Sequence, residues 1–169
     1  MNKVAVLLST YNGENYIHDL LDSFTNQNFK DFDLLVRDDG SSDQTINLIK
    51  KYEVTSNLNI IFVDSQNDFE VPELSLSASF FKLIKFANKN SNYKYFLFCD
   101  QDDIWHENKI QRMLDEIYLA EKNDLSKPLL AHSDLTLIDE QGDFMYASFW
   151  KWQGIMPFRN STSRLLIQN

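Results

Sequence analysis

Three carboxylates stand close together at Asp100, Asp102 and Asp103, directly after the apolar run 95–99. A short apolar run predicts a buried strand, so these side chains would lie just past the end of that strand. Clustered carboxylates repel one another beside an apolar core, and a divalent cation would relieve the repulsion. Their oxygens suit Mn²⁺ or Mg²⁺, which proteins often hold through one or two carboxylates together with substrate phosphates. The alternative is an acidic turn that caps the next helix.

A second polar loop, with Thr10, Tyr11 and Asn12, follows the apolar run 4–8. It offers an aromatic face, a hydroxyl and an amide, so that a planar base could lie against Tyr11. The alternative is an ordinary strand-to-helix turn in which Asn12 and Gly13 supply the backbone shape.

Two further carboxylates, Asp38 and Asp39, follow the apolar run 32–36. Carboxylate oxygens accept hydrogen bonds from a base N–H or from ribose hydroxyls. The alternative is helix capping by Asp39, Ser41 or Ser42, and capping and binding can coexist.

Extended and helical patterns alternate along the chain and predict an α/β fold, a mostly parallel sheet flanked by helices. Strands are predicted at 4–9, 32–36, 59–63, 95–99 and 129–138, and helices at 17–24, 46–52, 80–87 and 110–117. Residues 41–43 supply N-cap chemistry for the second helix, 64–77 form a polar loop, 141–143 form a tight turn, and no pattern is clear after Phe144. In such sheets ligands bind beyond the carboxyl ends of the strands, so we expect the three polar loops to share one rim.

Length and composition narrow the class of protein. The 169 residues fit one domain, and a hydrophobic content of 43% argues against disorder. A net charge of -9 argues against nucleic acid as a partner, because phosphate backbones attract basic surfaces. The single cysteine, Cys99, excludes an internal disulfide and is predicted to be a buried, inert thiol. Without an apolar run near 20 residues or a signal-like start, we expect a cytoplasmic protein.

Taken together, segments 8–14, 38–43 and 100–105 resemble family 2 glycosyltransferases of the GT-A fold, the nucleotide-diphospho-sugar transferase fold. The Asp-Gln-Asp-Asp-Ile-Trp form is similar to the rhamnosyltransferase-like branch that builds bacterial surface polysaccharides. The resemblance runs from about Val4 to at least Asp139. It implies an inverting, metal-dependent enzyme that moves a sugar, with rhamnose as a candidate, from a UDP- or dTDP-linked donor to a saccharide or lipid-linked saccharide acceptor.

The resemblance also implies roles for individual residues. The nucleotide sugar would be bound by Thr10, Tyr11, Asn12, Asp38, Asp39, Asp100, Asp103 and Asp134, and the metal by Asp102 and Asp100. Asp39 would accept a hydrogen bond from the base, and Asp100 would lie by the ribose. Asp102 would help to hold a metal that bridges the diphosphate. Asp134 would lie near the acceptor or donor sugar, and a polar strand end is its alternative.

The chain departs from the family pattern in two places. The loop after the third strand has no glycine in residues 67–73, and Ser79-Phe80 stands where relatives carry Asn-Phe. Relatives also continue past the point of Asn169 into an acidic motif that supplies the general base. We therefore expect a single GT-A domain over 1–169. Its nucleotide-sugar-binding part would be about 1–140, an irregular aromatic segment would follow at 141–169, and the base would lie beyond Asn169. Such a chain would bind donor and metal but transfer sugar poorly.

Two other functions fit parts of the pattern. A non-catalytic nucleotide- or metal-binding module would also carry acidic strand ends. A NAD-dependent oxidoreductase would use Asp38 on a ribose diol, but the first turn lacks the glycines of a dinucleotide fold. The aromatic run 149–152 suggests peripheral association with the inner face of the plasma membrane, and its alternative is a lid or a covered edge.

Overall fold

The computed structural model describes residues 3–63, 76–89, 93–123 and 128–154, which belong to two units, Met1–Arg112 and Met113–Asn169. Of the loop predicted at 64–77, residues 64–75 lie outside the described residues, including the glycine-free stretch 67–73, and so does the aromatic segment after 154. The prediction is wrong for residues 76 and 77, which belong to the helix Leu76–Lys89.

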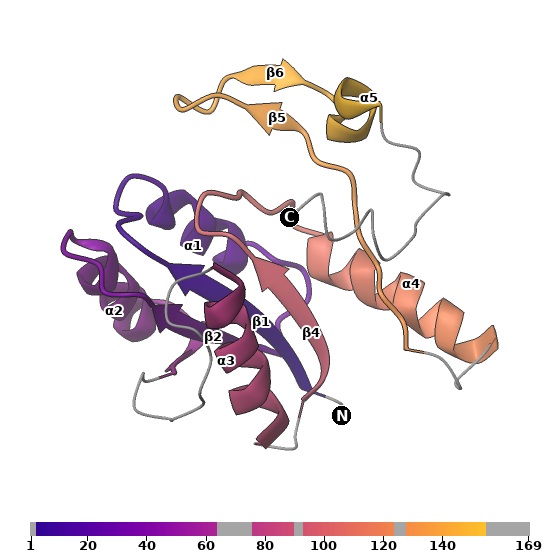
Figure 1. Ribbon diagram of the computed structural model, residues 1–169, viewed down its shortest axis with the longest axis horizontal. Helices are drawn as coiled ribbons and strands as arrows, with labels where there is room; N and C mark the ends of the chain where they lie inside the picture. The colour runs from indigo at the N-terminus through magenta and orange to yellow at the C-terminus, as the bar shows by residue number, and fades with distance from the viewer. Residues whose placement is uncertain (1–2, 64–75, 90–92, 124–127, 155–169) are drawn as a thin grey trace. The chain divides into compact units, whose positions relative to one another are not determined.

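Four parallel strands form the sheet of the first unit (Figure 1). They are β1 (Lys3–Thr10), β2 (Phe32–Asp38), β3 (Asn59–Phe62) and β4 (Tyr93–Cys99), in the order β3-β2-β1-β4. All pairings are parallel, so the predicted α/β class is confirmed. The central strand β1 is apolar on both faces, since Val4 to Leu8 are fully buried, as expected for a strand covered from both sides.

Helices cover both faces of this sheet. They are α1 (Ile17–Thr25), α2 (Thr45–Thr55) and α3 (Leu76–Lys89), and α4 (Lys109–Asn123) follows β4. From β1 the chain passes to the neighbouring strand β2 and then to β3 at one edge of the sheet. It then crosses back over the sheet to β4 at the other edge. Right-handed crossovers then place α1 and α2 on one face and α3 on the other. The α3 face is a core of Ala5, Leu7, Leu35, Val63, Leu83 and Ala87.

The start of α2 differs from the predicted capping. Residues 41–43 were expected to cap the helix, but its N-cap residue is Gln44, whose side chain makes no capping bond. Asp43 instead accepts the backbone N–H of Thr45 at 3.0 Å and its hydroxyl at 2.5 Å. Ser41 and Ser42 bond to Asn12 and are therefore engaged in holding another loop.

In the second unit the strand predicted at 129–138 is wrong. Only β5 (Leu137–Ile138) is extended, and it pairs antiparallel with β6 (Phe144–Tyr146) in a separate two-stranded sheet. The predicted turn between them is confirmed, because Gly142 has a φ of +82° and its N–H donates to the Asp139 carbonyl at 2.9 Å. A short helix, α5 (Phe149–Gln153), follows where no pattern was clear.

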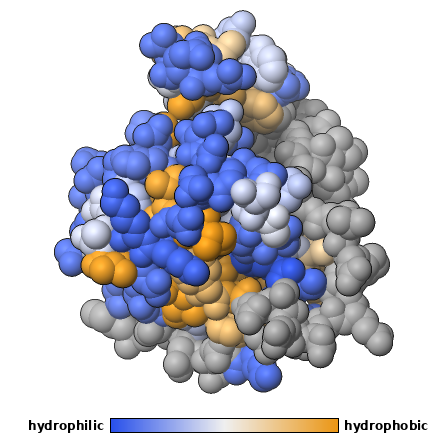
Figure 2. Space-filling view, turned by 90° about the vertical axis from the view of Figure 1, so that its left-hand side faces the viewer, coloured by the Kyte–Doolittle hydropathy of each residue, from blue (hydrophilic) through white to orange (hydrophobic). Residues whose placement is uncertain are grey.

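The described surface is mostly hydrophilic on the face shown in Figure 2, with hydrophobic side chains visible between the polar ones. Exposed apolar side chains in the second unit include Phe144, Met145, Tyr146 and Trp152. Within the described ranges, every helix is too short or too polar to cross a lipid bilayer.

Candidate functional site

The three polar loops meet at the carboxyl ends of β1, β2 and β4, which are neighbours in the sheet. The loop after β1 is bonded to both of the others. Tyr11 donates its N–H to Gln101 Oε1 at 2.9 Å, and Gln101 Nε2 donates to the Tyr11 carbonyl at 3.0 Å. On the other side, the N–H of Asp39 donates to the Thr10 carbonyl at 2.9 Å. The expected shared rim is therefore present in the structure.

A set of hydrogen bonds joins the loop after β1 to the loop after β2. Asn12 is central, because its N–H donates to Ser41 Oγ at 2.8 Å and its Oδ1 accepts the N–H of Ser42 at 2.9 Å. Asn12 adopts a φ of +46°, a left-handed conformation that Asn tolerates better than most residues. Its carbonyl-type oxygen is thus engaged in shaping the loops.

The Asp38 carboxylate is filled by hydrogen bonds from its own surroundings. Its Oδ1 accepts the hydroxyls of Thr10 at 2.8 Å and Ser41 at 2.5 Å. Its Oδ2 accepts the N–H groups of Gly40 at 3.0 Å and Ser41 at 2.7 Å. Asp38 and Thr10 therefore form the framework of the rim, and Asp38 has little acceptor capacity left for a ligand.

Asp39 points away from that framework, and its side chain remains 32% exposed. Its Oδ1 lies 3.3 Å from Nε of Arg37, a side chain that is itself only 8% exposed. Its Oδ2 accepts the hydroxyl of Ser79, at the start of α3. Asp39 is therefore the carboxylate of this loop that is both held in place and open to solvent.

Tyr11 presents its ring to solvent at 57% exposure, although its backbone is fixed by Gln101. Gly13 leaves room for the Gln101 amide, since a Cβ on that residue would lie 2.4 Å from Gln101 Oε1 and would displace this side chain. An exposed ring on an anchored backbone suits stacking against a planar group.

The acidic loop after β4 has the electrostatics of crowded like charges. Burial raises the pKa of Asp100, and the neighbouring charge of Asp102 raises it further. Burial likewise raises the pKa of Asp103. The negative charges of Asp100 and Asp102 raise this pKa further, and the positive charge of Lys109 lowers it. A cation at this place would therefore stabilise the charged forms.

The acidic loop carries the carboxylates of Asp100, Asp102 and Asp103, but the described residues do not form a complete set of metal ligands. No group of three or more His, Cys, Asp or Glu side chains within the described residues has the arrangement that holds a metal ion. Mg²⁺ and Mn²⁺ commonly take one or two carboxylates and complete their shell with waters and phosphates, so the pair Asp100 and Asp102 is compatible with either ion.

The preceding thiol behaves as predicted. Cys99 is buried, and burial raises its pKa well above 9.0, with the charges of Asp103 and Asp100 adding to the effect. A thiol held in its neutral form is a poor nucleophile, so Cys99 is a packing residue.

Asp134 belongs to the second unit and organises α5. Its carboxylate accepts the Ser148 hydroxyl at 2.5 Å and the backbone N–H groups of Leu135 at 2.9 Å and Trp150 at 3.0 Å. The His132 ring packs edge-on against Trp150, with ring centroids 5.3 Å apart. Segments 132–134 and 148–150 are therefore one hydrogen-bonded cluster.

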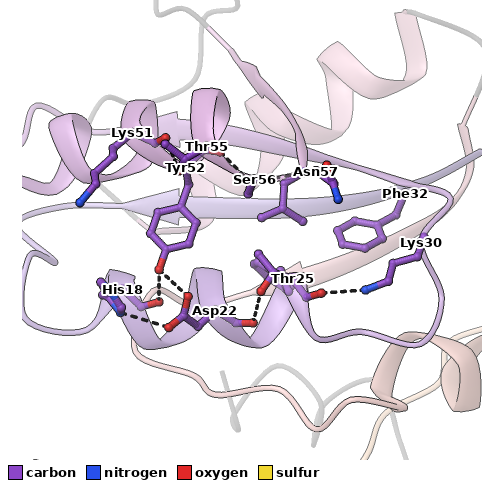
Figure 3. Close-up of a pocket in the computed structure, with 12 residues that line it drawn as sticks. His18, Asp22, Thr25, Lys30, Phe32, Lys51, Tyr52, Thr55, Ser56 and Asn57 are labelled. Carbon is purple, nitrogen blue, oxygen red and sulfur yellow. Dashed lines mark hydrogen bonds and ion pairs between the residues drawn. The ribbon is translucent and has the colours of Figure 1, made fainter.

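A cavity of about 700 Å³ lies between α1 and α2, away from the rim (Figure 3). It is lined by Thr25 at the end of α1 and by Phe32 at the start of β2, so it opens at the amino end of the sheet. Its polar groups bond to one another, as Tyr52 Oη does to Asp22 at 2.5 Å. We therefore interpret it as a groove between two packed helices.

Sequence reasoning missed three residues of the rim, Arg37, Ser79 and Gln101. One signal was present for Arg37, since a charged residue interrupts the apolar run of β2 just before Asp38. Ser79 stands out in the sequence only as the residue where relatives carry Asn, and Gln101 only as part of the acidic segment 100–103. Neither position indicates its contact, because the partners are distant in the chain.

Comparison with known proteins shows the family of this chain. A family model described as "Glycosyl transferase family 2" matches residues 5–161. The dTDP-rhamnosyl transferase RfbG of Shigella flexneri is 32% identical over 125 residues, which are 74% of this chain and 42% of that protein. The poly(ribitol-phosphate) beta-N-acetylglucosaminyltransferase TarS of Staphylococcus aureus is 29% identical over 144 residues, 84% of this chain and 22% of TarS.

A solved structure of S. aureus TarS 1-349 in complex with UDP superposes on 69% of this chain and 32% of that chain, with a TM-score of 0.51 and 29% identity. The chain spans less than half the length of these curated relatives. Because the family model covers the sheet, the three loops and most of the second unit, this chain belongs to glycosyl transferase family 2.

Proposed function

We propose that this chain carries the donor-binding part of a glycosyltransferase that takes its sugar from a nucleoside diphosphate. The observation that carries the proposal is the joining of Tyr11, Asp39 and the acidic loop at one rim, through Gln101 and the Thr10 carbonyl. The exposed ring of Tyr11 suits stacking against a base, and the exposed carboxylate of Asp39 suits an N–H donor of that base. The crowded carboxylates of the acidic loop suit a metal-bound diphosphate.

The nucleotide base would stack on Tyr11 and donate a hydrogen bond to Asp39. Thr10, Asn12 and Asp38 would act mainly by shaping the two loops, since their polar groups already bond within the rim. Asp100 would lie by the ribose, and Asp103, which is partly buried beside Lys109, would support the loop or the donor sugar.

A divalent metal ion fits the acidic loop because burial, and after it the charge of Asp102, raises the pKa of Asp100, as expected for crowded carboxylates beside an apolar core. Asp100 and Asp102 would hold Mn²⁺ or Mg²⁺. When bound, such an ion supplies a Lewis acid that stabilises the charge growing on the departing diphosphate.

The acceptor would be a saccharide or a lipid-linked saccharide. Its hydroxyl would attack the anomeric carbon of the donor with inversion as the nucleoside diphosphate leaves, in the pathway of a bacterial surface polysaccharide. The similarity to a rhamnosyl transferase supports rhamnose as a candidate sugar, and the similarity to TarS supports N-acetylglucosamine as another. A cytoplasmic site, at the inner face of the plasma membrane, and a general base beyond Asn169 stay predictions. So does a sugar contact by Asp134, whose described partners lie in its own unit.

Thermal denaturation with UDP and dTDP, each with and without Mn²⁺, tests the proposal. A ligand that binds only the native state raises the melting temperature, so a shift that needs both nucleotide and metal is expected. NAD serves as the comparison ligand. Stabilisation by NAD but by neither nucleoside diphosphate would contradict the proposal.

A further inference from the structure

The buried cation at the end of β2 has no role in the scheme above. Arg37 is 93% buried, and such a side chain is rarely buried without a partner, because removing its charge from water is costly. Its Nε lies 3.3 Å from Asp39 Oδ1, an ion pair without hydrogen-bond alignment, and that nitrogen has no hydrogen-bond partner within the described residues.

The second oxygen of Asp39 is held from a different element. Ser79 on α3 is 2% exposed and donates its hydroxyl to Asp39 Oδ2. The backbone of Asp39 is fixed in turn, since its N–H donates to the Thr10 carbonyl at the end of β1. Three elements, β2, α3 and β1, thus fix the direction in which this carboxylate faces.

The neighbouring carboxylate does not compete for these partners. Asp38 has a separate set of partners, because it accepts the Thr10 and Ser41 hydroxyls and two backbone N–H groups. The positive charge of Arg37 is therefore directed at Asp39. A carboxylate beside a guanidinium can only accept hydrogen bonds at its free lone pairs.

We propose that Arg37 and Ser79 are positioning residues that hold Asp39 as an oriented acceptor and so make the site selective for bases with an N–H donor at the centre of the pairing edge. Uracil and thymine present N3–H there, whereas cytosine presents an unprotonated N3 that would face the carboxylate lone pairs. The inference rests on the proposed function, because it takes the ligand to be a nucleoside diphosphate.

Titration calorimetry of the full chain with UDP and CDP in the presence of Mn²⁺ tests this. The wild type is expected to prefer UDP by at least about tenfold, since a polar site rejects an analogue that leaves its group unpaired. Arg37→Met should lower UDP affinity about tenfold and CDP affinity much less, so the preference collapses. Arg37→Lys should restore part of it, and Ser79→Ala should reduce it about threefold.

Lys51→Met is the matched control, because Lys51 is an exposed cation on α2 and its loss should leave both affinities unchanged. Equal losses for UDP and CDP in Arg37→Met, or an unchanged preference in both Arg37→Met and Ser79→Ala, would overturn the inference while leaving the proposed function intact. A wild type that binds neither nucleotide would overturn the proposed function itself.

Discussion

The side-chain amide of Gln101 pairs with the backbone of Tyr11 in both directions, at 2.9 and 3.0 Å, across 90 positions of sequence. The amide therefore joins the loops that follow β1 and β4 by a pair of hydrogen bonds, as a neighbouring strand would. Because Gln101 lies between Asp100 and Asp102, the same contact ties the exposed ring to the acidic loop. The position of Tyr11 is thus set by the loop proposed to hold the metal.

Gly13→Ala should weaken nucleotide binding through Gln101. The new Cβ would lie 2.4 Å from Gln101 Oε1 and would displace an amide that both of its hydrogen bonds hold in place. We expect UDP affinity to fall about fivefold, the effect of losing roughly one net hydrogen bond. Titration calorimetry measures the change.

A double-mutant cycle supplies the control for that variant. Gln101→Ala alone should give a similar loss, and Gly13→Ala in the Gln101→Ala background should cost almost nothing more, because the clash is gone. Additive losses would show that Gly13 acts by another route.

Asp102→Asn should stabilise the free protein and abolish its response to metal. Burial, and after it the charge of Asp102, raises the pKa of Asp100 above 3.8, so the ionised pair costs stability at neutral pH. This cost is absent below the unfolded value of 3.8 and grows as the pH rises through the raised folded value. We expect the melting temperature without metal to rise by about 1–4 °C. The additional shift with UDP and Mn²⁺ should disappear.

Glu53→Gln is the matched charge removal for Asp102→Asn, on the exposed side of α2. It should change neither the melting temperature nor the response to Mn²⁺. A Mn²⁺-dependent shift that survives in Asp102→Asn would rule this carboxylate out as a metal ligand.

Tyr93→Phe should reduce stability without changing nucleotide binding. The Tyr93 hydroxyl donates to Asp33 at 2.6 Å, and Asp33 is buried at the amino end of the sheet. Burial, followed by the Asp33 charge, raises the pKa of this phenol. Loss of the bond should lower the free energy of unfolding by about 1–2 kcal/mol in urea denaturation.

Tyr146→Phe provides the comparison for Tyr93→Phe, because Tyr146 is 47% exposed whereas the partner of Tyr93, Asp33, is buried. Its unfolding free energy should match the wild type. A large drop in UDP affinity in Tyr93→Phe would contradict the assignment of binding to the opposite edge of the sheet.

Acid should loosen α5 through Asp134. Burial raises the pKa of Asp134, but hydrogen bonds from Ser148 and from the N–H groups of Trp150 and Leu135 outweigh it and hold the pKa below 3.8. A lowered pKa gives stability that is present above 3.8 and is lost as the pH falls through the folded value. Hydrogen exchange at residues 149–153, corrected for intrinsic rates, should therefore speed up below about pH 4.

Asp134→Ala should show the faster exchange at every pH and lose its pH dependence, while residues of β1 stay protected. If the wild-type exchange profile were flat across this range, the carboxylate would not be the group that holds α5.

Much of the first unit was predictable because its signals are local. Both faces of β1 are apolar over Val4 to Leu8, and α1 repeats its buried residues at helical spacing. Parallel strands bring their carboxyl ends to one edge, so the meeting of the three loops followed from topology alone. The strand predicted at 129–138 is wrong because the conformation there depends on distant residues. Its apolar residues flank Asp134, and Asp134 bonds to Ser148 and Trp150, which come later in the chain.

The sequence by itself determined the α/β class, the three polar loops and the residue types that they carry. Only the tertiary structure decided which carboxylate is engaged and which is exposed. Asp38 accepts hydrogen bonds from Thr10 and from its own turn, whereas Asp39 is partly exposed and is held by Arg37 and Ser79. The physical reason is that a carboxylate's role depends on which donors reach its lone pairs. Those donors come from strands and helices whose distance in the chain says little about their distance in space.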